Sequence, residues 1–293
     1  MDTIRFSIAT HRGCYGECNF CAITVHQGRK IIWRGRASIL NEARALTEHP
    51  RFKGIIQDVG GPTANMYGID CARKEKQGSC PDKRCLFPKI CSRLTVNHER
   101  QISLLKALRA VSGVKKVIIA SGIRHDLILA DKKHGAEYLK QVVRHHVSGQ
   151  MKIAPEHSEP HVLDKMGKSG REELITFRDL FFDLTKRGKQ NLFLTYYLIA
   201  AHPGCTDDDM ARLRSFALRD LQLLPEQIQI FTPTPSTWST LIYWTERDPF
   251  TGKACFVEKT RQGRERQKNI LADRRTKKPP TVRWKTKKRN SHR

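Results

Sequence analysis

The sequence predicts an α/β protein built on an incomplete parallel barrel of six strand and helix units, (βα)6, with a cysteine-rich insertion at about residues 68–96. Six runs typical of buried strands alternate with helical patterns, and their short connections favour parallel strands with right-handed crossovers. The chain is too short for eight such units. Apolar periodicity ends after Pro249, so we expect a core at 1–245 and a basic, largely disordered C-terminal tail at 246–293.

Each expected strand is a short β-rich or continuous apolar run. A continuous apolar run is typical of a parallel strand that is covered on both faces. The six runs occupy residues 4–10, 54–59, 116–120, 151–154, 192–199 and 227–231.

The helices expected between the strands have apolar residues at helical spacing and recognisable ends. Good capping residues precede three of them, and Pro50 and Gly188 end two. Three successive aspartates in the first turn of the last helix complement the helix dipole. These helices begin near Ser38, Asn97, residue 139, residue 174 and Thr206.

Three cysteines follow the first expected strand on a loop that also contains glycine. Cys14, Cys18 and Cys21 have the spacing C-x3-C-x2-C. Iron–sulfur cubes are held by cysteine thiolates, and a fully ligated cube takes four of them. A local set of three therefore predicts a [4Fe–4S] cluster with one open iron, placed at the mouth of the barrel because loops at the carboxyl ends of barrel strands carry function.

With Phe20 directly before the third cysteine, this loop resembles the signature of radical S-adenosylmethionine (SAM) enzymes. Longer stretches resemble the YgiQ (UPF0313-type) family of radical SAM proteins from about residue 4 to about residue 255. They read HRGCYGECNFCAITVHQGR, DVGGPTANMYG, CLFPKICSRLTVNHERQISLLKALR, GVKKVIIASGIRHDL, KIAPEHSEPHVLDKMGK and YYLIAAHPGC.

The resemblance implies a cytoplasmic enzyme whose cluster is held by Cys14, Cys18 and Cys21. The open iron would chelate SAM, and an electron from a donor such as flavodoxin or ferredoxin would generate a 5′-deoxyadenosyl radical. The substrate is not implied. The family normally has a substantial region before the barrel, whereas this chain begins almost at the first strand. We therefore expect a fragment that holds a cluster, with an incomplete substrate site and doubtful activity.

Two further segments are expected to contact SAM. Gly60 and Gly61 follow the second strand, where paired glycines let a ligand approach the backbone. Radical SAM enzymes commonly have an acidic residue next, but this chain has Pro62, so only backbone contacts carry over. The turn after the fifth strand resembles the adenine-contacting segment, which here contains His202, Pro203 and Gly204.

Polar residues also follow the third and fourth strands. Ser121 and Arg124 are candidates for the ribose or carboxylate of SAM, although Arg124 equally suits an ion pair with Asp126. Glu156 and His157 are candidate proton-transfer residues, since burial and mutual contact tune such groups, although a structural role is equally compatible with the pattern.

A second set of cysteines lies in the insertion. Cys71, Cys80, Cys85 and Cys91 are spaced C-x8-C-x4-C-x5-C, which matches no standard zinc finger. Small loop-rich segments often need a metal to fold. Three alternatives remain open, namely a structural zinc ion, a second iron–sulfur cluster, or free thiols.

The formal net charge is +25, and residues 246–293 contain 17 Lys+Arg against 5 Asp+Glu. Such a tail is either a solvated, disordered segment or a clamp for the phosphates of a nucleic acid. The alternative function is accordingly a metal-stabilised, basic RNA-binding protein without catalytic turnover. The sequence has no membrane-spanning apolar run and no export signal, and its nine cysteines predict metal ligands or reduced thiols, so we expect no membrane partner and a cytoplasmic location.

Overall fold

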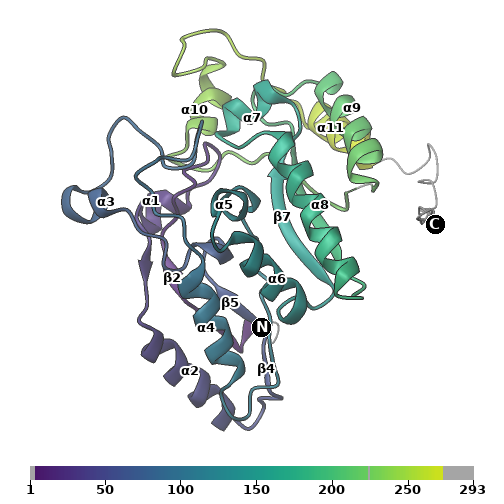
Figure 1. Cartoon of the computed structure of the whole chain (residues 1–293). Coiled ribbons are helices and arrows are strands. Elements are labelled where there is room, and N and C mark those ends of the chain that lie inside the picture. The colour runs from purple at the N-terminus through teal and green to yellow at the C-terminus, as the bar shows by residue number, and fades with distance from the viewer. Residues whose placement is uncertain (1–3, 224, 273–293) are drawn as a thin grey trace, which may run out of the picture.

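The computed structural model describes residues 4–223 and 225–272 of a mixed α/β protein (Figure 1). Its strands are β1 (Ser7–Ala9), β2 (His11–Arg12), β3 (Ile32–Trp33), β4 (Ile55–Ile56), β5 (Asp58–Gly60), β6 (Lys116–Val117), β7 (Gln150–Glu156), β8 (Phe193–Ala200) and β9 (Gln227–Ile230). Its α-helices are α1 (Ile23–Gln27), α2 (Arg36–Glu48), α3 (Ala72–Gln77), α4 (Glu99–Arg109), α5 (His125–Ala130), α6 (Gly135–His145), α7 (Pro160–Met166), α8 (Arg171–Arg187), α9 (Asp207–Phe216), α10 (Trp238–Thr245) and α11 (Arg261–Ala272). A 3-10 turn at Ala64–Met66 and a π-helical turn at Ala217–Leu221 complete the description.

The six expected strand regions are all parallel to one another and pair in chain order. β1 pairs with β5, β4 with β6, and β7, β8 and β9 form one sheet. A parallel bridge between Ile123 and Ile153 connects the third region to the fourth. This order is the one that an incomplete (βα)6 barrel requires, and closure into a barrel stays a prediction.

The third strand region is shorter than the apolar run at 116–120 predicted. Only Lys116 and Val117 have strand geometry. The Asp58 carboxylate accepts hydrogen bonds from the backbone nitrogens of Ala120 (2.8 Å) and Ser121 (3.1 Å). A side chain therefore replaces the neighbouring backbone as hydrogen-bond acceptor, and the regular ladder ends there.

Helices α2, α4, α6 and α8 form a row along one side of the strands, and each contacts the next (Figure 1). All four were expected from the sequence, with ends within a few residues of those observed. Their buried faces pack against the strands in one apolar core, which includes Ile39, Leu105, Leu139, Phe177, Ile8, Val117, Ile153 and Tyr196. No helix in the described part of the chain combines the length and apolar character needed to cross a membrane.

The C-terminal extension differs from the sequence expectation. We expected a largely disordered extension at 246–293, but Arg247 and Ala254 form an antiparallel bridge and residues 261–272 form α11, which packs against α9, β8 and β9. The buried face of α11 consists of Gly263, Gln267 and Leu271, so it lacks the apolar periodicity that predicts a helix. The rest of the expected tail, residues 273–293, lies outside the described residues.

Gln267 attaches α11 to the turn after β8. Its side chain accepts a hydrogen bond from Ala201 N (2.9 Å) and donates one to Cys205 O (2.9 Å), and it is fully buried. We expect Gln267→Ala to lower the free energy of unfolding by about 2–4 kcal/mol, because it leaves two buried backbone groups unpaired. Urea denaturation measures this change.

The matched control is Gln262→Ala, which removes an exposed glutamine from the same helix. It should change the free energy of unfolding by less than about 0.5 kcal/mol. Equal effects of the two substitutions would contradict the anchoring role of Gln267.

Candidate functional site

The cysteine loop is held at both ends by the antiparallel pair β2 and β3, in which His11 pairs with Trp33. The loop begins at Gly13, which has a φ of +85°. A Cβ atom there would lie 1.9 Å from Lys30 O, so only glycine fits. The two ends of the loop are therefore fixed against each other before the cysteines are reached.

The thiols of the loop gather around Gly16. A Cβ atom at Gly16 would lie 3.3 Å from Cys14 Sγ and 3.5 Å from Cys18 Sγ. Burial, which is the largest cause, together with the charges of the other two thiols and of Glu156, raises the pKa of Cys21 to about 11 against the lowering effect of a hydrogen bond from the Ile23 backbone. The three thiols are therefore electrostatically coupled and face the same region.

The three thiols are a donor set that an iron–sulfur cluster can use. In a [4Fe–4S] cluster each thiolate binds a different iron, so three thiolates leave one iron open. Cys14, Cys18 and Cys21, all free and partly exposed, are the residues that would hold such a cluster.

Arg124 lies directly against this loop. Its Nη1 donates to Cys18 Sγ (3.6 Å), while its Nε donates to Asp126 Oδ1 (2.9 Å). Burial alone would raise the pKa of Asp126, but the Arg124 guanidinium outweighs it and holds that pKa below its usual range. Of the two roles considered for Arg124, the structure shows the ion pair with Asp126, and a contact with SAM stays a prediction.

Three other expected SAM-binding residues have partners within the chain. Ser121 Oγ donates to the Asp58 carboxylate. A Cβ atom at Gly61 would lie 2.6 Å from His11 Nε2. The group that approaches the backbone closely at Gly61 is therefore the His11 imidazole of the protein itself. Gly60 O accepts hydrogen bonds from the backbone and hydroxyl of Thr10.

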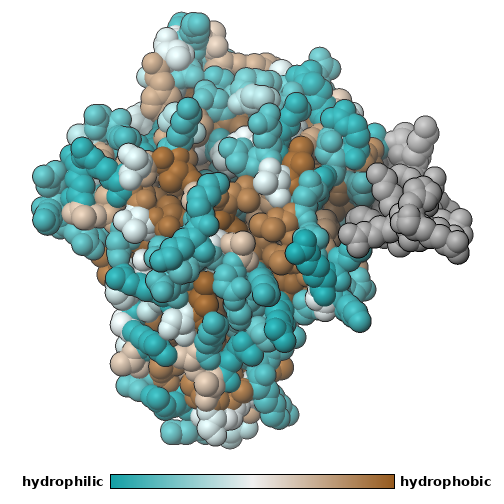
Figure 2. Space-filling model, in the orientation of Figure 1, coloured by the Kyte–Doolittle hydropathy of each residue, from teal (hydrophilic) through white to brown (hydrophobic). Residues whose placement is uncertain are grey.

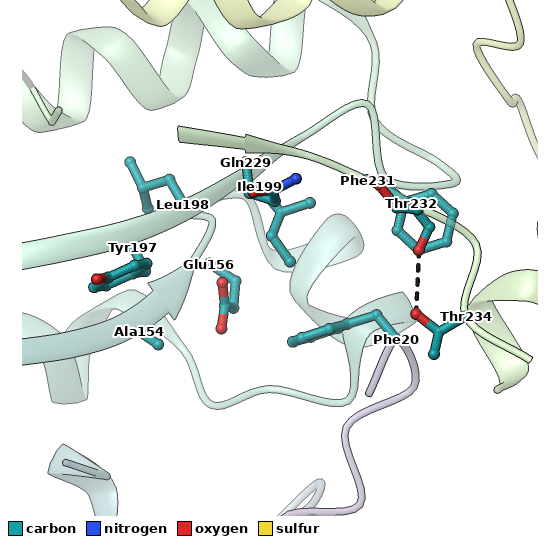
Figure 3. Close-up of a pocket in the computed structure, with 10 residues that line it drawn as sticks. All are labelled: Phe20, Ala154, Glu156, Tyr197, Leu198, Ile199, Gln229, Phe231, Thr232 and Thr234. Carbon is teal, nitrogen blue, oxygen red and sulfur yellow. Dashed lines mark hydrogen bonds between the residues drawn. The ribbon is translucent and has the colours of Figure 1, made fainter. Parts of the chain in front are cut away.

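A cavity of about 450 Å³ opens at the carboxyl ends of β7, β8 and β9 (Figure 3). Phe20 of the cysteine loop forms part of its wall, so the cavity and the thiols are adjacent. The other lining residues are Ala154, Glu156, Tyr197, Leu198, Ile199, Gln229, Phe231, Thr232 and Thr234.

Glu156 and His157 lie in different surroundings. β7 has a register irregularity between Ile153 and Glu156, and Glu156 has a φ of +71°. Its carboxylate faces the cavity, with the Phe20 ring extending toward it (Figure 3). Burial raises the pKa of Glu156, against the lowering effect of Lys168, whose Nζ lies 4.0 Å away.

His157 lies outside the cavity lining. Its Nδ1 accepts from Glu159 N (3.1 Å), and its Nε2 lies 3.5 Å from Cys205 Sγ. Burial lowers the pKa of His157 to about 3, so the ring is neutral. These contacts fit the structural role considered for His157, and proton transfer by Glu156 or His157 stays a prediction.

His202 packs between the cysteine loop and the cavity wall. Its ring contacts Phe20 (6.2 Å between centroids) and Phe231 (5.2 Å). Its Nδ1 donates to Pro203 O (2.9 Å), and its Nε2 accepts from Ser239 Oγ (2.7 Å). Both ring nitrogens are thus occupied, and Gly204 N donates to Phe256 O (2.7 Å).

Sequence reasoning did not single out several residues of the cavity. Gln229 lies in β9, Thr232 and Thr234 follow that strand, and Tyr197 lies in β8. Their position at strand ends was the available signal. The four cysteines of the insertion lie together in the structure, because all four line a second pocket of about 410 Å³.

Comparison with known proteins identifies relatives along almost the whole chain, although no family model matches it. A UPF0313 protein of Fusobacterium nucleatum is 54% identical over 275 residues, which are 94% of this chain and 48% of the relative. A UPF0313 protein of Methanosarcina acetivorans is 46% identical over 271 residues, 92% of this chain and 36% of the relative. The chain thus spans about half, or less, of the length of these relatives.

Solved structures with a similar fold are radical SAM enzymes. The methyltransferase TsrM of Kitasatospora setae, with cobalamin and a [4Fe–4S] cluster bound, has a TM-score of 0.51 at 14% identity, covering 81% of this chain and 38% of that one. The cobalamin-dependent enzyme OxsB, with aqua-cobalamin and SAM bound, has a TM-score of 0.52 at 16% identity, covering 80% and 28%.

The parallel strands with a cysteine loop at their carboxyl ends therefore have the fold of radical SAM enzymes. Along almost its whole length, the chain is similar to UPF0313 proteins.

Proposed function

We propose that the chain is the core of a radical SAM enzyme, in which Cys14, Cys18 and Cys21 hold a [4Fe–4S] cluster beside a SAM site. One observation carries the proposal: the cysteine loop lies at the carboxyl ends of parallel strands and contributes Phe20 to the adjoining cavity. The volume of about 450 Å³ is in the range that holds ligands of the size of SAM. A flavodoxin or ferredoxin in the cytoplasm is the proposed electron donor.

When bound, the cluster and SAM together supply a 5′-deoxyadenosyl radical. The residues of the chain bind and orient the cluster and SAM and enclose them. The β2 and β3 pair fixes the loop, and the Arg124 guanidinium lies beside the Cys18 thiol, where a positive charge offsets the negative charge of thiolates. Apolar side chains of the cavity, among them Phe20 and Phe231, exclude water from the bound ligand.

Glu156 is the proposed partner of the SAM amino group. Pro62 occupies the position at which radical SAM enzymes commonly have an acid, so we assign that role to another carboxylate. Glu156 is the carboxylate among the cavity-lining residues, and its charge contributes to the raised pKa of Cys21. A buried carboxylate that accepts a hydrogen bond from the amino group contributes strongly to binding, because hydrogen bonds to a charged acceptor are stronger than neutral ones.

The cluster assignment predicts a specific loss of iron. In anaerobically purified protein, Cys18→Ala should remove about four irons and four sulfides per chain relative to the unmodified protein. Iron and sulfide quantification measures this loss. Cys255→Ala is the matched control, since Cys255 is buried away from the loop and should leave the iron content unchanged. Equal iron in the unmodified protein and Cys18→Ala would refute the assignment.

The Glu156 assignment predicts a pH dependence of SAM binding. Because burial raises the pKa of Glu156 above its ordinary 4.5, its carboxylate is fully ionised only above that raised value. SAM affinity should therefore increase with pH through this range and be lost on acidification. Glu156→Gln should weaken binding about tenfold or more at neutral pH and remove the dependence.

Anaerobic calorimetry between about pH 5.5 and 8 measures both effects. The control is Glu173→Gln, which alters an exposed glutamate of α8 and should bind SAM with unchanged affinity. The assignment fails if Glu156→Gln binds SAM like the unmodified protein at every pH.

A further inference from the structure

The cysteine-rich insertion is a closed lobe with its own pocket. An antiparallel bridge between Asp70 and Thr95 joins its two ends, with Thr95 N donating to Asp70 O (3.0 Å). α3 is its one helix among the described residues. From the four cysteines that line the pocket, we propose that this lobe binds a second iron–sulfur cluster, held by Cys71, Cys80, Cys85 and Cys91.

The four thiols approach the pocket from different parts of the lobe. Cys71 precedes α3 and is buried, as is Cys85, whereas Cys80 and Cys91 are partly exposed. Cys91 N donates to Cys85 O (2.8 Å), which draws the last two ligands together. Four thiolates are the ligand set of fully ligated iron–sulfur clusters.

The charges of the pocket favour an anionic occupant. The lining residues include one carboxylate, Asp82, and a larger number of cations. One of these cations already contacts a thiol, since Arg73 Nη1 donates to Cys80 Sγ (2.8 Å). Cations crowded in this way repel one another unless an anion lies among them. A cluster with four thiolates supplies that negative charge. The lining cations are Arg73, Lys74, Lys83, Arg84 and Arg93.

Lys74 is the clearest sign of such an occupant. Its side chain is fully buried, and it lies against the Cys85 thiol. Its Nζ donates to Arg29 O (2.5 Å) and lies 3.4 Å from Glu17 Oε1. Glu17 is already paired with Arg29 at 2.5 Å, so it neutralises the ammonium only in part. A buried ammonium is costly unless fully paired, and an anionic cluster beside Cys85 completes the pairing.

The same contacts place the lobe against the first cysteine loop. Glu17 and Arg29 both belong to that loop, and the Lys74 ammonium lies 5.2 Å from the Tyr15 ring centroid. Tyr15 is buried in one small apolar cluster with Cys71 and Cys85, and Cys14 packs against that cluster. The second site is thus separated from the first by a single layer of side chains, and Figure 1 shows α3 beside α1.

The size of the pocket favours an iron–sulfur cluster over zinc. Four thiolates are the ligand set of either group. A single zinc ion would fill only a small part of about 410 Å³. The apolar cluster of the lobe is small and its outer surface is mainly hydrophilic (Figure 2), so a bound cluster would supply much of its folding energy.

Two complementary variants of the full chain test the proposal. Changing Cys14, Cys18 and Cys21 to Ala leaves the lobe intact, and this protein should retain about four irons and four sulfides. Changing Cys71, Cys80, Cys85 and Cys91 to Ala should also leave about four, against about eight in the unmodified protein. Metal analysis for iron and zinc, sulfide determination and Mössbauer spectroscopy provide the readouts, with Cys255→Ala as the control.

The two sites succeed or fail separately in this design. Iron that persists in the first variant supports the second cluster, whatever the first loop binds. One zinc per chain in that variant, or neither metal, would overturn the proposal. The second variant, which lacks the four cysteines of the insertion, tests the same proposal by loss of iron. If its iron content equals that of the unmodified protein, the proposed second cluster is refuted, even if the lobe itself no longer folds.

Discussion

The Arg124 guanidinium connects the cysteine loop to the parallel strands, and the geometry of the site depends on it. The backbone N of Arg124 donates to Asn65 Oδ1 (2.8 Å), and the backbone O of Arg124 accepts from Asn65 Nδ2 (2.9 Å). The side chain of Arg124 donates to Asp126 and to Cys18. Three segments distant in sequence, those of Cys18, Asn65 and Arg124 itself, therefore meet at one buried residue. Breaking such a buried pair leaves an uncompensated charge and costs about 3–5 kcal/mol, so the arrangement is rigid.

A common electrostatic principle applies to both cysteine sets. Each set brings several thiols into a buried or half-buried position, where negative charge is costly unless a cation lies beside it. Arg124 is that cation for the first loop, and Lys74 is the corresponding cation for the insertion. Because Lys74 also contacts Glu17 and Arg29, the two sites share a wall.

Much of this fold was predictable because it depends on local patterns. The strand runs, the main helices and the position of the three-cysteine loop follow from periodicity and spacing along the chain, although Ser38 lies inside α2 and does not cap it. The capping box at Thr206 is an example, since Thr206 Oγ1 accepts from Asp209 N (3.3 Å) as its sequence suggests. Pro160 and Gly167 likewise signal the ends of α7, although that helix was not predicted.

The remaining features depend on contacts that the sequence does not encode locally. The irregularity in β7 turns Glu156 toward the cavity and leaves His157 against Cys205, so adjacent residues have unrelated environments. The Nε2 atom of His202 is hydrogen-bonded to Ser239, which lies 37 residues away in the sequence. The helix α11 was not predicted because its buried face contains Gln267, whose hydrogen bonds to Ala201 and Cys205 replace apolar packing.

The central claim is that SAM binds directly to the cluster held by Cys14, Cys18 and Cys21. Electron paramagnetic resonance of anaerobic, dithionite-reduced protein tests it most directly, with spectra recorded before and after addition of SAM. In the variant that lacks the four cysteines of the insertion, only the first cluster contributes to the spectrum. The account predicts a reduced [4Fe–4S] signal whose g values shift when SAM is added. A signal that SAM leaves unchanged would contradict it.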